Sequence, residues 1–316
     1  MSLLQTGLRE EVKCMPDLGT SLPMSMSLHN PVSFMLKRIL AGDVVPYGRH
    51  QDEIFYKYVF DDGSAVVYLP PECVTANRVA LWVRSSTRQG SCVTLVGGKG
   101  LVDASRLFMG CGKLKIIDMR YLDARRVTTI AMAFFYCTNV EVLLLPNTGL
   151  PALKDCTGTF FACLKLRQID LKGVNTSKVE NMSYMFGGCD SLVELDVSGI
   201  DTSSATSFES MFRQCQSLKT LDVSHFDVSM VTMINDMFRG CSSLESLNLS
   251  GLCFKSCTHA DRIFMSCDKL SELNTVGLSF PKLSPANTNF FAEYDIGSKQ
   301  TFAGALSSVF GGKNDG

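Results

Sequence analysis

The sequence has no excess of charge of either sign and no long apolar run. Its 316 residues include 30 basic and 31 acidic side chains, which leaves a formal net charge of −1. This balance provides no overall field that would attract a nucleic acid or an anionic membrane. Nowhere do eighteen apolar residues follow one another, so we expect no membrane insertion. Any partner must therefore be recognised by local features of the surface.

The N-terminus lacks the features of a secretory signal peptide. Its opening residues, MSLLQTGLREE, have neither a basic start nor an apolar core. We therefore expect synthesis in the cytoplasm, followed either by display in a particle or by export without a signal peptide. The sequence does not identify the final compartment.

Motifs of catalysis and of cofactor binding are also scarce. No G-x-S-x-G or H-E-x-x-H motif is present, and the GGKG run at 97–100 lacks the Ser or Thr of a phosphate-binding loop. Cys253, Cys257 and His259 could supply three zinc ligands, whereas a structural zinc site needs four. We therefore predict no enzyme activity, no cofactor and no bound metal.

Cysteine is abundant, and its spacing reveals an internal repeat. Seven of the thirteen cysteines follow one another at intervals of 26 residues, and each has a phenylalanine three residues before it. The cysteines are Cys111, Cys137, Cys163, Cys189, Cys215, Cys241 and Cys267, and the phenylalanines are Phe108, Phe134, Phe160, Phe186, Phe212, Phe238 and Phe264. A fixed period of this length indicates a solenoid.

The hydrophobic pattern changes its period within each repeat. In the fourth repeat, apolar residues at 182, 185, 186 and 189 predict one face of a short helix. Leu195 and Val197 then alternate with polar residues, which predicts a short strand with one buried face. The fold expected is an α/β solenoid, a leucine-rich-repeat array of seven strand-turn-helix repeats, with a small N-terminal α+β domain or cap.

The flanks differ from the array in composition. We assign 104–280 to the solenoid, 281–316 to a C-terminal cap and tail, and 1–103 to an N-terminal part. The sequence leaves open whether this last part is an independent domain or an enlarged cap. Its expected elements are an amphipathic helix at 31–40, a hairpin of strands at 54–60 and 64–69, and further strands at 79–84 and 91–96.

The repeated cysteines are interpreted as packing residues. Buried cysteine behaves as a small hydrophobic residue, and a disulfide would need Cα atoms within about 7 Å of each other. Equivalent positions on successive helices would lie about 10 Å apart. We therefore expect the seven thiols to be reduced and chemically inert.

The outward face of the predicted strands is the candidate binding surface. If Leu195 and Val197 point inward, their polar neighbours point outward, and the same register applies to the other repeats. The outward positions assigned to binding are Gln168, Asp170, Lys172, Glu194, Asp196, Ser198, Asp222, Ser224, Asn248 and Ser250. The Asp and Asn residues could equally form a structural ladder that satisfies backbone groups. An acidic and amide row also argues against a nucleic acid partner.

The second repeat interrupts this row with the sequence LLLP at 143–146. Leu144 and Pro146 are expected to place an apolar, rigid spot on the outer face. An exposed apolar site beside polar rows is a plausible contact with a partner. Leu144 and Pro146 are therefore included among the predicted binding residues.

The repeats resemble those of a known family. The segments NMSYMFGGCDSLVELDVS at 181–198 and NDMFRGCSSLESLNLS at 235–250 are similar to the BspA-like leucine-rich-repeat surface proteins, and the resemblance covers about 104–275. It implies a solenoid used for adhesion or protein binding, usually displayed on a bacterial surface. The chain shows no signal peptide, no lipid-attachment cysteine at its start and no cell-wall sorting signal at its end.

These observations favour a non-catalytic binding protein whose partner is a protein or a cell-surface glycan. The alternative is a structural or receptor-binding component of a larger assembly such as a phage or virus particle, joined to other subunits through the N-terminal part. An enzyme carried by 1–105 ranks last, because no acid, base or nucleophile constellation is recognisable there. The sequence identifies neither the ligand nor the oligomeric state.

Overall fold

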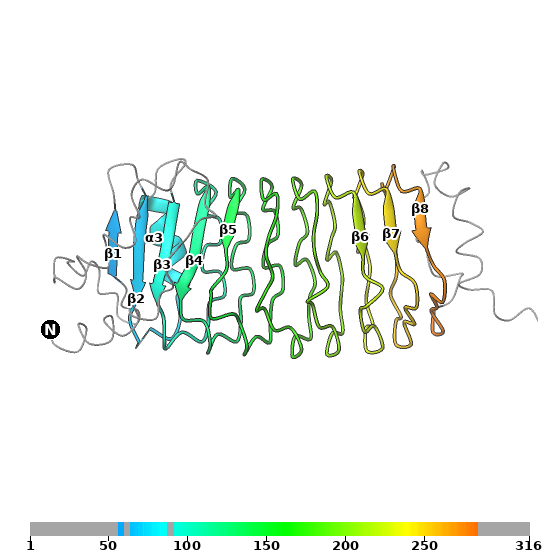
Figure 1. The fold of residues 1–316 in the computed structure, drawn as a ribbon, viewed down its shortest axis with the longest axis horizontal. Coiled ribbons are helices and arrows are strands. Elements are labelled where there is room, and N and C mark those ends of the chain that lie inside the picture. The colour runs from blue at the N-terminus through cyan, green and yellow to red at the C-terminus, as the bar shows by residue number, and fades with distance from the viewer. Residues whose placement is uncertain (1–55, 60–63, 72, 87–91, 284–316) are drawn as a thin grey trace, which may run out of the picture.

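The computed structural model describes residues 56–59, 64–71, 73–86 and 92–283, and the helix predicted at 31–40 lies outside these ranges. The chain winds into coils that stack side by side along one axis, with a strand position in each coil (Figure 1). The array is thus a β-solenoid of stacked parallel strands.

Within the described ranges, eight strands form two sheets. β1 (Tyr56–Val59), β2 (Ala65–Leu69), β3 (Cys92–Gly97), β4 (Ile116–Leu122) and β5 (Val142–Leu144) form the first, in that order. β6 (Thr220–Asp222), β7 (Ser246–Asn248) and β8 (Glu272–Asn274) form the second. Every pair is parallel except β1 with β2, and Leu221 pairs with Leu247 and Leu247 with Leu273, one repeat apart. The equivalent segments 168–170 and 194–196 are not regular strands.

The N-terminal expectations were partly correct. β1 and β2 pair as the expected antiparallel hairpin, and β3 is the strand predicted at 91–96. The strand predicted at 79–84 is wrong, because α3 (Asn77–Ser86) occupies this segment. Val79, Ala80 and Val83 are buried whereas Leu81 is 60% exposed, which is the burial period of a helix and not of a strand.

The short helices expected in the repeats are not confirmed. The segments at 105–110, 183–188 and their equivalents are successive turns, and α3 is the one α-helix among the residues that the structure describes. The amide of Phe160 donates to the carbonyl of Met185, and that of Phe186 to the carbonyl of Met211, both at 2.9 Å. These bonds join neighbouring coils, whereas a helix would place them within one coil.

Positive φ angles explain why no helix forms there. Two positions in each repeat adopt left-handed backbone: the first at Arg106, Met132, Gly158, Tyr184, Ser210, Asp236 and Arg262, the second at Gly110, Tyr136, Ala162, Gly188, Gln214, Gly240 and Ser266. A left-handed residue interrupts an α-helix of L-amino acids. The residues at 182, 185, 186 and 189 are nonetheless all buried, so the inward face of the segment was predicted correctly.

The repeated phenylalanines form one continuous stack inside the array. The seven rings from Phe108 to Phe264 are all buried, and neighbouring rings are stacked with centroids 5.5–6.1 Å apart. The stack runs parallel to the solenoid axis. Each coil is therefore held to the next by aromatic packing as well as by backbone hydrogen bonds.

The repeated cysteines add a second internal ladder. The Cys215 thiol donates to the carbonyl oxygen of Phe186 at 3.2 Å, and the Cys241 thiol to that of Phe212 at 3.1 Å. The same contact joins Cys137, Cys163, Cys189 and Cys267 to the phenylalanine of the preceding repeat, at 3.1–3.3 Å. All seven repeated cysteines are buried as thiols and not as disulfides. Packing alone would allow any small apolar residue at this position. The hydrogen bond to the backbone carbonyl explains why the residue is a cysteine.

Candidate binding surface

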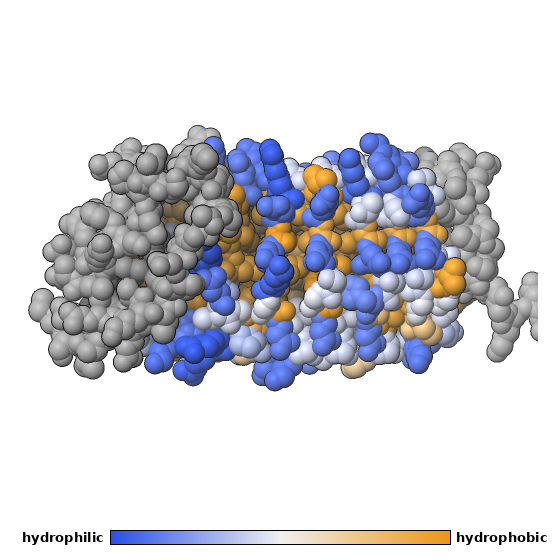
Figure 2. Space-filling view, viewed as in Figure 1, coloured by the Kyte–Doolittle hydropathy of each residue, from blue (hydrophilic) through white to orange (hydrophobic). Residues whose placement is uncertain are grey.

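The strand face is the outward side of the segment that contains β4 to β8 and the equivalent 168–170 and 194–196. Leu195, Leu221 and Leu247 point inward and are buried, whereas Asp170, Asp196 and Asp222 are exposed on the outer side. Figure 2 shows a row of hydrophilic residues along the length of the array beside a band of apolar ones. The alternation that the sequence predicts is therefore present.

The Asp and Asn row shapes the turn that follows each strand. The Oδ1 atom of Asp196 accepts a hydrogen bond from the Ser198 amide at 2.9 Å, and Asp222 accepts one from Ser224 at 2.9 Å. The same bond joins Asp118 to Arg120, Asp170 to Lys172, Asn248 to Ser250 and Asn274 to Val276, at 2.9–3.2 Å. These are Asx turns, so the row has the structural role that the sequence left open.

Hydrogen bonding also favours the charged form of these carboxylates. The pKa of Asp196 is lowered first by the Ser198 side chain, then by the Ser198 amide and the nearby Lys172. The pKa of Asp222 is lowered by the corresponding bonds from Ser224. Both carboxylates therefore remain ionised well into the acidic range while facing solvent.

Two further ladders of the same kind shape the other corners of the coil. At the first corner, a side-chain oxygen accepts a hydrogen bond from the backbone amide two residues later. The residues that supply this oxygen are Asp103, Thr129, Asp155, Asn181 and Ser207. At the second corner, the same hydrogen bond is accepted by the side chains of Asp123, Asn175, Asp201 and Asp227. Polar residues at three corners are thus explained by backbone geometry, which leaves the positions between them for recognition.

The predicted apolar spot in the second repeat needs correction. Pro146 is buried and Leu145 packs against the hydrophobic core, so Pro146 is not on the outer face. Leu144 is half-buried on that face. The apolar residue that is exposed on the strand face in this repeat is instead Val142, which is 37% exposed at the start of β5.

A tight turn after β5 explains the buried proline. The Gly149 amide donates to the Pro146 carbonyl at 2.9 Å, and Gly149 has a φ of 66°. A Cβ at Gly149 would lie 2.5 Å from the Gly173 carbonyl oxygen, so only glycine fits. The turn therefore draws Pro146 into the core.

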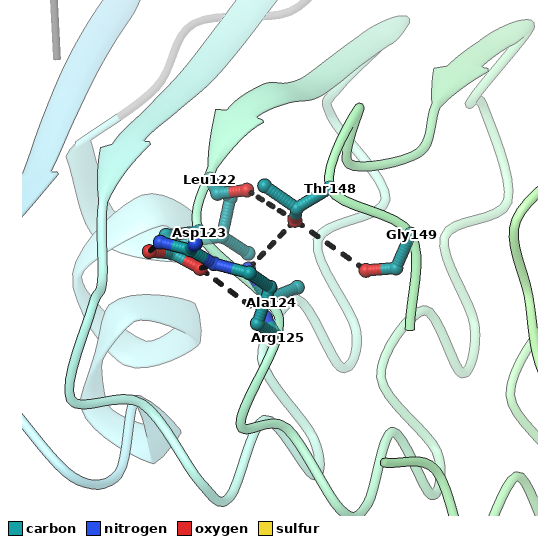
Figure 3. Close-up of polar contacts among 6 residues, drawn as sticks. All are labelled: Leu122, Asp123, Ala124, Arg125, Thr148 and Gly149. Carbon is teal, nitrogen blue, oxygen red and sulfur yellow. Dashed lines mark hydrogen bonds and ion pairs between the residues drawn. The ribbon is translucent and has the colours of Figure 1, made fainter. Parts of the chain in front are cut away.

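Thr148 fastens this turn to the preceding coil (Figure 3). Its hydroxyl accepts a hydrogen bond from the Ala124 amide at 3.0 Å and lies 3.2 Å from the Leu122 carbonyl oxygen. Beside it, Arg125 forms an ion pair with Asp123 at 2.5 Å. The Thr148 contacts join the turn to the first repeat, whereas the Arg125–Asp123 pair is local.

The other predicted binding residues are exposed to different degrees. Gln168, Lys172, Glu194 and Ser198 are exposed on the strand face, whereas Ser224, Asn248 and Ser250 are half-buried. The structure adds further outward positions in the same register: Ile116, Val142, Thr220, Ser246 and Glu272. Extending the 26-residue register to every repeat would have found them.

The array contains two small interior cavities and a larger, open depression on its surface. Two apolar cavities in the interior have volumes of about 20 Å³ and about 10 Å³, enough for about one water molecule each. A shallow depression of about 480 Å³ lies on the strand face over β7 and β8, lined by 246–248 and 272–274. The interior cavities cannot hold an organic substrate, whereas the open depression can contact another surface.

The described ranges contain neither a cluster of metal ligands nor a membrane-spanning helix. No group of three or more His, Cys, Asp or Glu side chains there is placed to hold a metal ion. Nor do those ranges contain a helix that is long and apolar enough to span a membrane. Cys257 instead donates to the carbonyl of His259 at 3.5 Å.

The chain is similar to known repeat proteins. The model of the BspA type leucine rich repeat region (6 copies) matches 104–191, and the model "Mycoplasma protein of unknown function, DUF285" matches 154–275. A search of curated proteins finds no match. Among solved structures, the crystal structure of a TLR13–ssRNA13 complex is similar, with a TM-score of 0.32 and 14% identity over 66% of this chain. The match spans 32% of that longer chain. Residues 104–191 therefore match the BspA type leucine-rich-repeat region.

Proposed function

We propose that the array binds another macromolecule, a protein or a glycan, through its strand face, and that it does so without catalysis. The observation that carries this proposal is the regular outward row of polar side chains on an open surface. The interior cavities are too small for a substrate, which also favours recognition of a large partner. The repeat family supports a binding role, and adhesion is one form that this role could take.

The side chains best suited to contact are those without a structural role. Gln168 and Glu194 are exposed, and neither side chain makes a hydrogen bond or ion pair within the described part of the chain. The Lys172 amide donates to the Asp170 carboxylate at 2.9 Å, and the charge of Lys172 lowers the pKa of Asp196 on the same face. Partner groups that donate hydrogen bonds or carry positive charge would complement the carboxylates.

Binding partners can be found with arrays of glycans and of extracellular proteins, and the affinity then measured by surface plasmon resonance. Lys172→Glu is expected to weaken binding at least about tenfold, because it reverses a charge at the centre of the face. Lys178→Glu is the matched control, since Lys178 is an exposed lysine of the same repeat on another side of the coil. It should leave the affinity unchanged.

A second pair of variants separates charge from backbone geometry. Asp196→Asn with Asp222→Asn removes two carboxylates but keeps the Asx turns, as Asn248 shows in the same ladder. Loss of binding in this variant would show that the carboxylates contact the partner. If Lys172→Glu and the double Asn variant both bind normally, the strand face is not the site.

A further inference from the structure

One edge of the array carries charges in a self-complementary order. The strand-entry corner is defined as 112–116 and the equivalent residues of the later repeats, where each coil enters its strand at the upper edge of Figure 1. Its charged residues in the first six repeats are, in order, Lys113 and Lys115, Glu141, Lys165 and Arg167, Asp190 and Glu194, Lys219, and Glu245. The formal charges of these repeats are therefore +2, −1, +2, −2, +1 and −1.

These charges are available to a partner. Asp190 is half-buried and the other eight side chains are exposed. None of the nine forms an ion pair or a side-chain hydrogen bond with any residue that the structure describes. The ion pairs of the array lie elsewhere, at Asp118, Asp123 and Asp236.

Apolar side chains occupy the middle of the corner. Leu164 in the third repeat is 37% exposed, and Val193 in the fourth repeat is 41% exposed. They lie where the charge changes from +2 to −2. An apolar centre flanked by charges is the usual composition of a protein–protein interface.

The same polarity extends over the whole array. Residues 104–180 contain 11 basic and 6 acidic side chains, a net charge of +5. Residues 181–283 contain 7 basic and 12 acidic side chains, a net charge of −5. The near-zero charge of the chain therefore conceals an electric dipole along the solenoid.

We propose that a second copy of this chain packs antiparallel against the strand-entry corner, with a two-fold axis between the third and fourth repeats. In such an isologous interface, each contact occurs twice. The third repeat then faces the fourth repeat of the second copy, so that Lys165 and Arg167 oppose Asp190 and Glu194. The second repeat faces the fifth, so that Glu141 opposes Lys219. The first repeat faces the sixth, which opposes two lysines to Glu245.

The repeat geometry keeps these pairs aligned. Both copies have the same rise per coil, which for paired strands is about 4.8 Å, so every repeat finds its counterpart. An axis on the third or fourth repeat would instead oppose like charges, +2 to +2 or −2 to −2. An axis between the second and third repeats opposes unlike charges in two pairs of repeats, whereas the proposed axis does so in three. The charge order therefore favours the proposed register, in which Leu164 and Val193 are buried next to the axis.

Charge-swap variants test this register directly. Lys165→Glu/Arg167→Glu makes the third and fourth repeats both acidic, and Asp190→Lys/Glu194→Lys makes both basic. Each variant alone should be monomeric in sedimentation velocity at low salt, with dimerisation at least about tenfold weaker than in the wild type. An equimolar mixture should form a dimer, because both symmetry-related contacts again join opposite charges.

The control applies the same charge change outside the corner. Lys154→Glu/Lys178→Glu alters two exposed lysines of the array and should leave the wild-type dimer intact. Thermal unfolding of each variant establishes that it is folded. The wild-type dimer should also weaken as salt is raised, since the Debye length falls from about 10 Å at 0.1 M to about 3 Å at 1 M.

Two results would overturn the proposal. The first is a wild-type chain that stays monomeric at low salt up to high micromolar concentration. The second is a mixture of folded swap variants that remains monomeric while the wild type dimerises. Neither result depends on the strand-face ligand, because both are measured on the purified chain alone; Glu194 belongs to both surfaces, whereas Lys172, Asp196 and Asp222 lie outside the corner.

Discussion

Single residues of this protein are repeated because each one contacts its own copy in the next coil. Phe212 is fully buried, and its ring stacks on Phe186 at 5.8 Å and on Phe238 at 5.7 Å. A change at one position of the ladder therefore affects three repeats. This explains why the phenylalanine is kept without exception over seven repeats.

Replacing Phe212 with alanine tests the contribution of one ring. We expect Phe212→Ala to lower the free energy of unfolding by about 3–5 kcal/mol, because it leaves a cavity and removes two stacked contacts. Urea unfolding followed by fluorescence or circular dichroism measures the change. Phe212→Leu keeps most of the volume and should cost less. A loss below about 1 kcal/mol in the alanine variant would contradict a fully packed ladder.

The repeated thiols should be unreactive in the native state. Burial raises the pKa of Cys137, Cys163, Cys189, Cys215 and Cys241, and raises that of Cys111 to about 12, so these six thiols form no thiolate near neutral pH. Labelling with a thiol reagent at pH 8 should therefore reach the half-buried Cys92 and Cys253 before any cysteine of the ladder. In a variant with Cys14, Cys92 and Cys253 changed to serine, the remaining thiols should react only after denaturant has unfolded the chain. Rapid labelling of that native variant would show that the ladder opens.

At the scale of the element, the Asx turns make the free energy of unfolding depend on pH. The pKa of Asp222 is below its usual value because Ser224 donates to the carboxylate. The unfolded chain therefore binds more protons at low pH than the folded chain does. The stabilisation is fully present above the ordinary Asp pKa of about 3.9 and is lost as the pH falls through the lower folded pKa.

Asp222→Asn and Asp222→Ala separate the two contributions of this residue. The Asn variant keeps the acceptor for the Ser224 amide and should have nearly wild-type stability at pH 7, with a shallower loss below pH 4. The Ala variant leaves that amide without its acceptor and should be less stable at both pH values. Unfolding midpoints in urea at pH 7 and pH 3 measure these differences. Equal midpoints for Asn and Ala at pH 7 would mean that the turn does not need the bond.

The sequence predicted the strand register and the inward residues but not the backbone of the turn segment. Apolar residues at i, i+3, i+4 and i+7 are buried equally by a helix and by two successive turns, so the pattern could not separate them. The two left-handed positions of each repeat are occupied by Gly in some repeats and by Tyr, Gln or Ser in others, for example Gly110, Tyr136 and Gln214. No single residue type marks them. The hydrogen bonds to the next coil that compensate for this backbone are visible only in three dimensions.

The candidate site shows the same limit. The polar alternation placed Asp170, Asp196 and Asp222 correctly on the outer face. Pro146 was misplaced because the rule of alternation assumes a continuing strand, whereas β5 ends at Leu144. The turn closed by Gly149 depends on its fit against Gly173 of the next coil. A contact between residues of different repeats is not encoded in a local pattern.

At the scale of the whole molecule, each coil is stabilised by its contacts with the neighbouring coils. Each repeat bonds only its neighbours, as the pairing of β6 with β7 and of β7 with β8 shows. Such arrays are described by intrinsic repeat stabilities and nearest-neighbour terms. The buried Asp236 illustrates one of these terms, because it pairs with Arg262 of the next repeat at 2.9 Å and with Arg239 of its own at 3.3 Å.

The same substitution should therefore act differently at the centre and near the start of the array. Phe186 stacks on Phe160 and Phe212, whereas among the described residues Phe108 stacks only on Phe134. Phe186→Ala should cost about 0.5–1.5 kcal/mol more than Phe108→Ala, the value of one aromatic pair. It should also uncouple the two halves, so that urea unfolding divides into two transitions, while Phe108→Ala keeps a single one. Single transitions of equal midpoint in both variants would mean that the array unfolds as one unit whose repeats are coupled far beyond their neighbours.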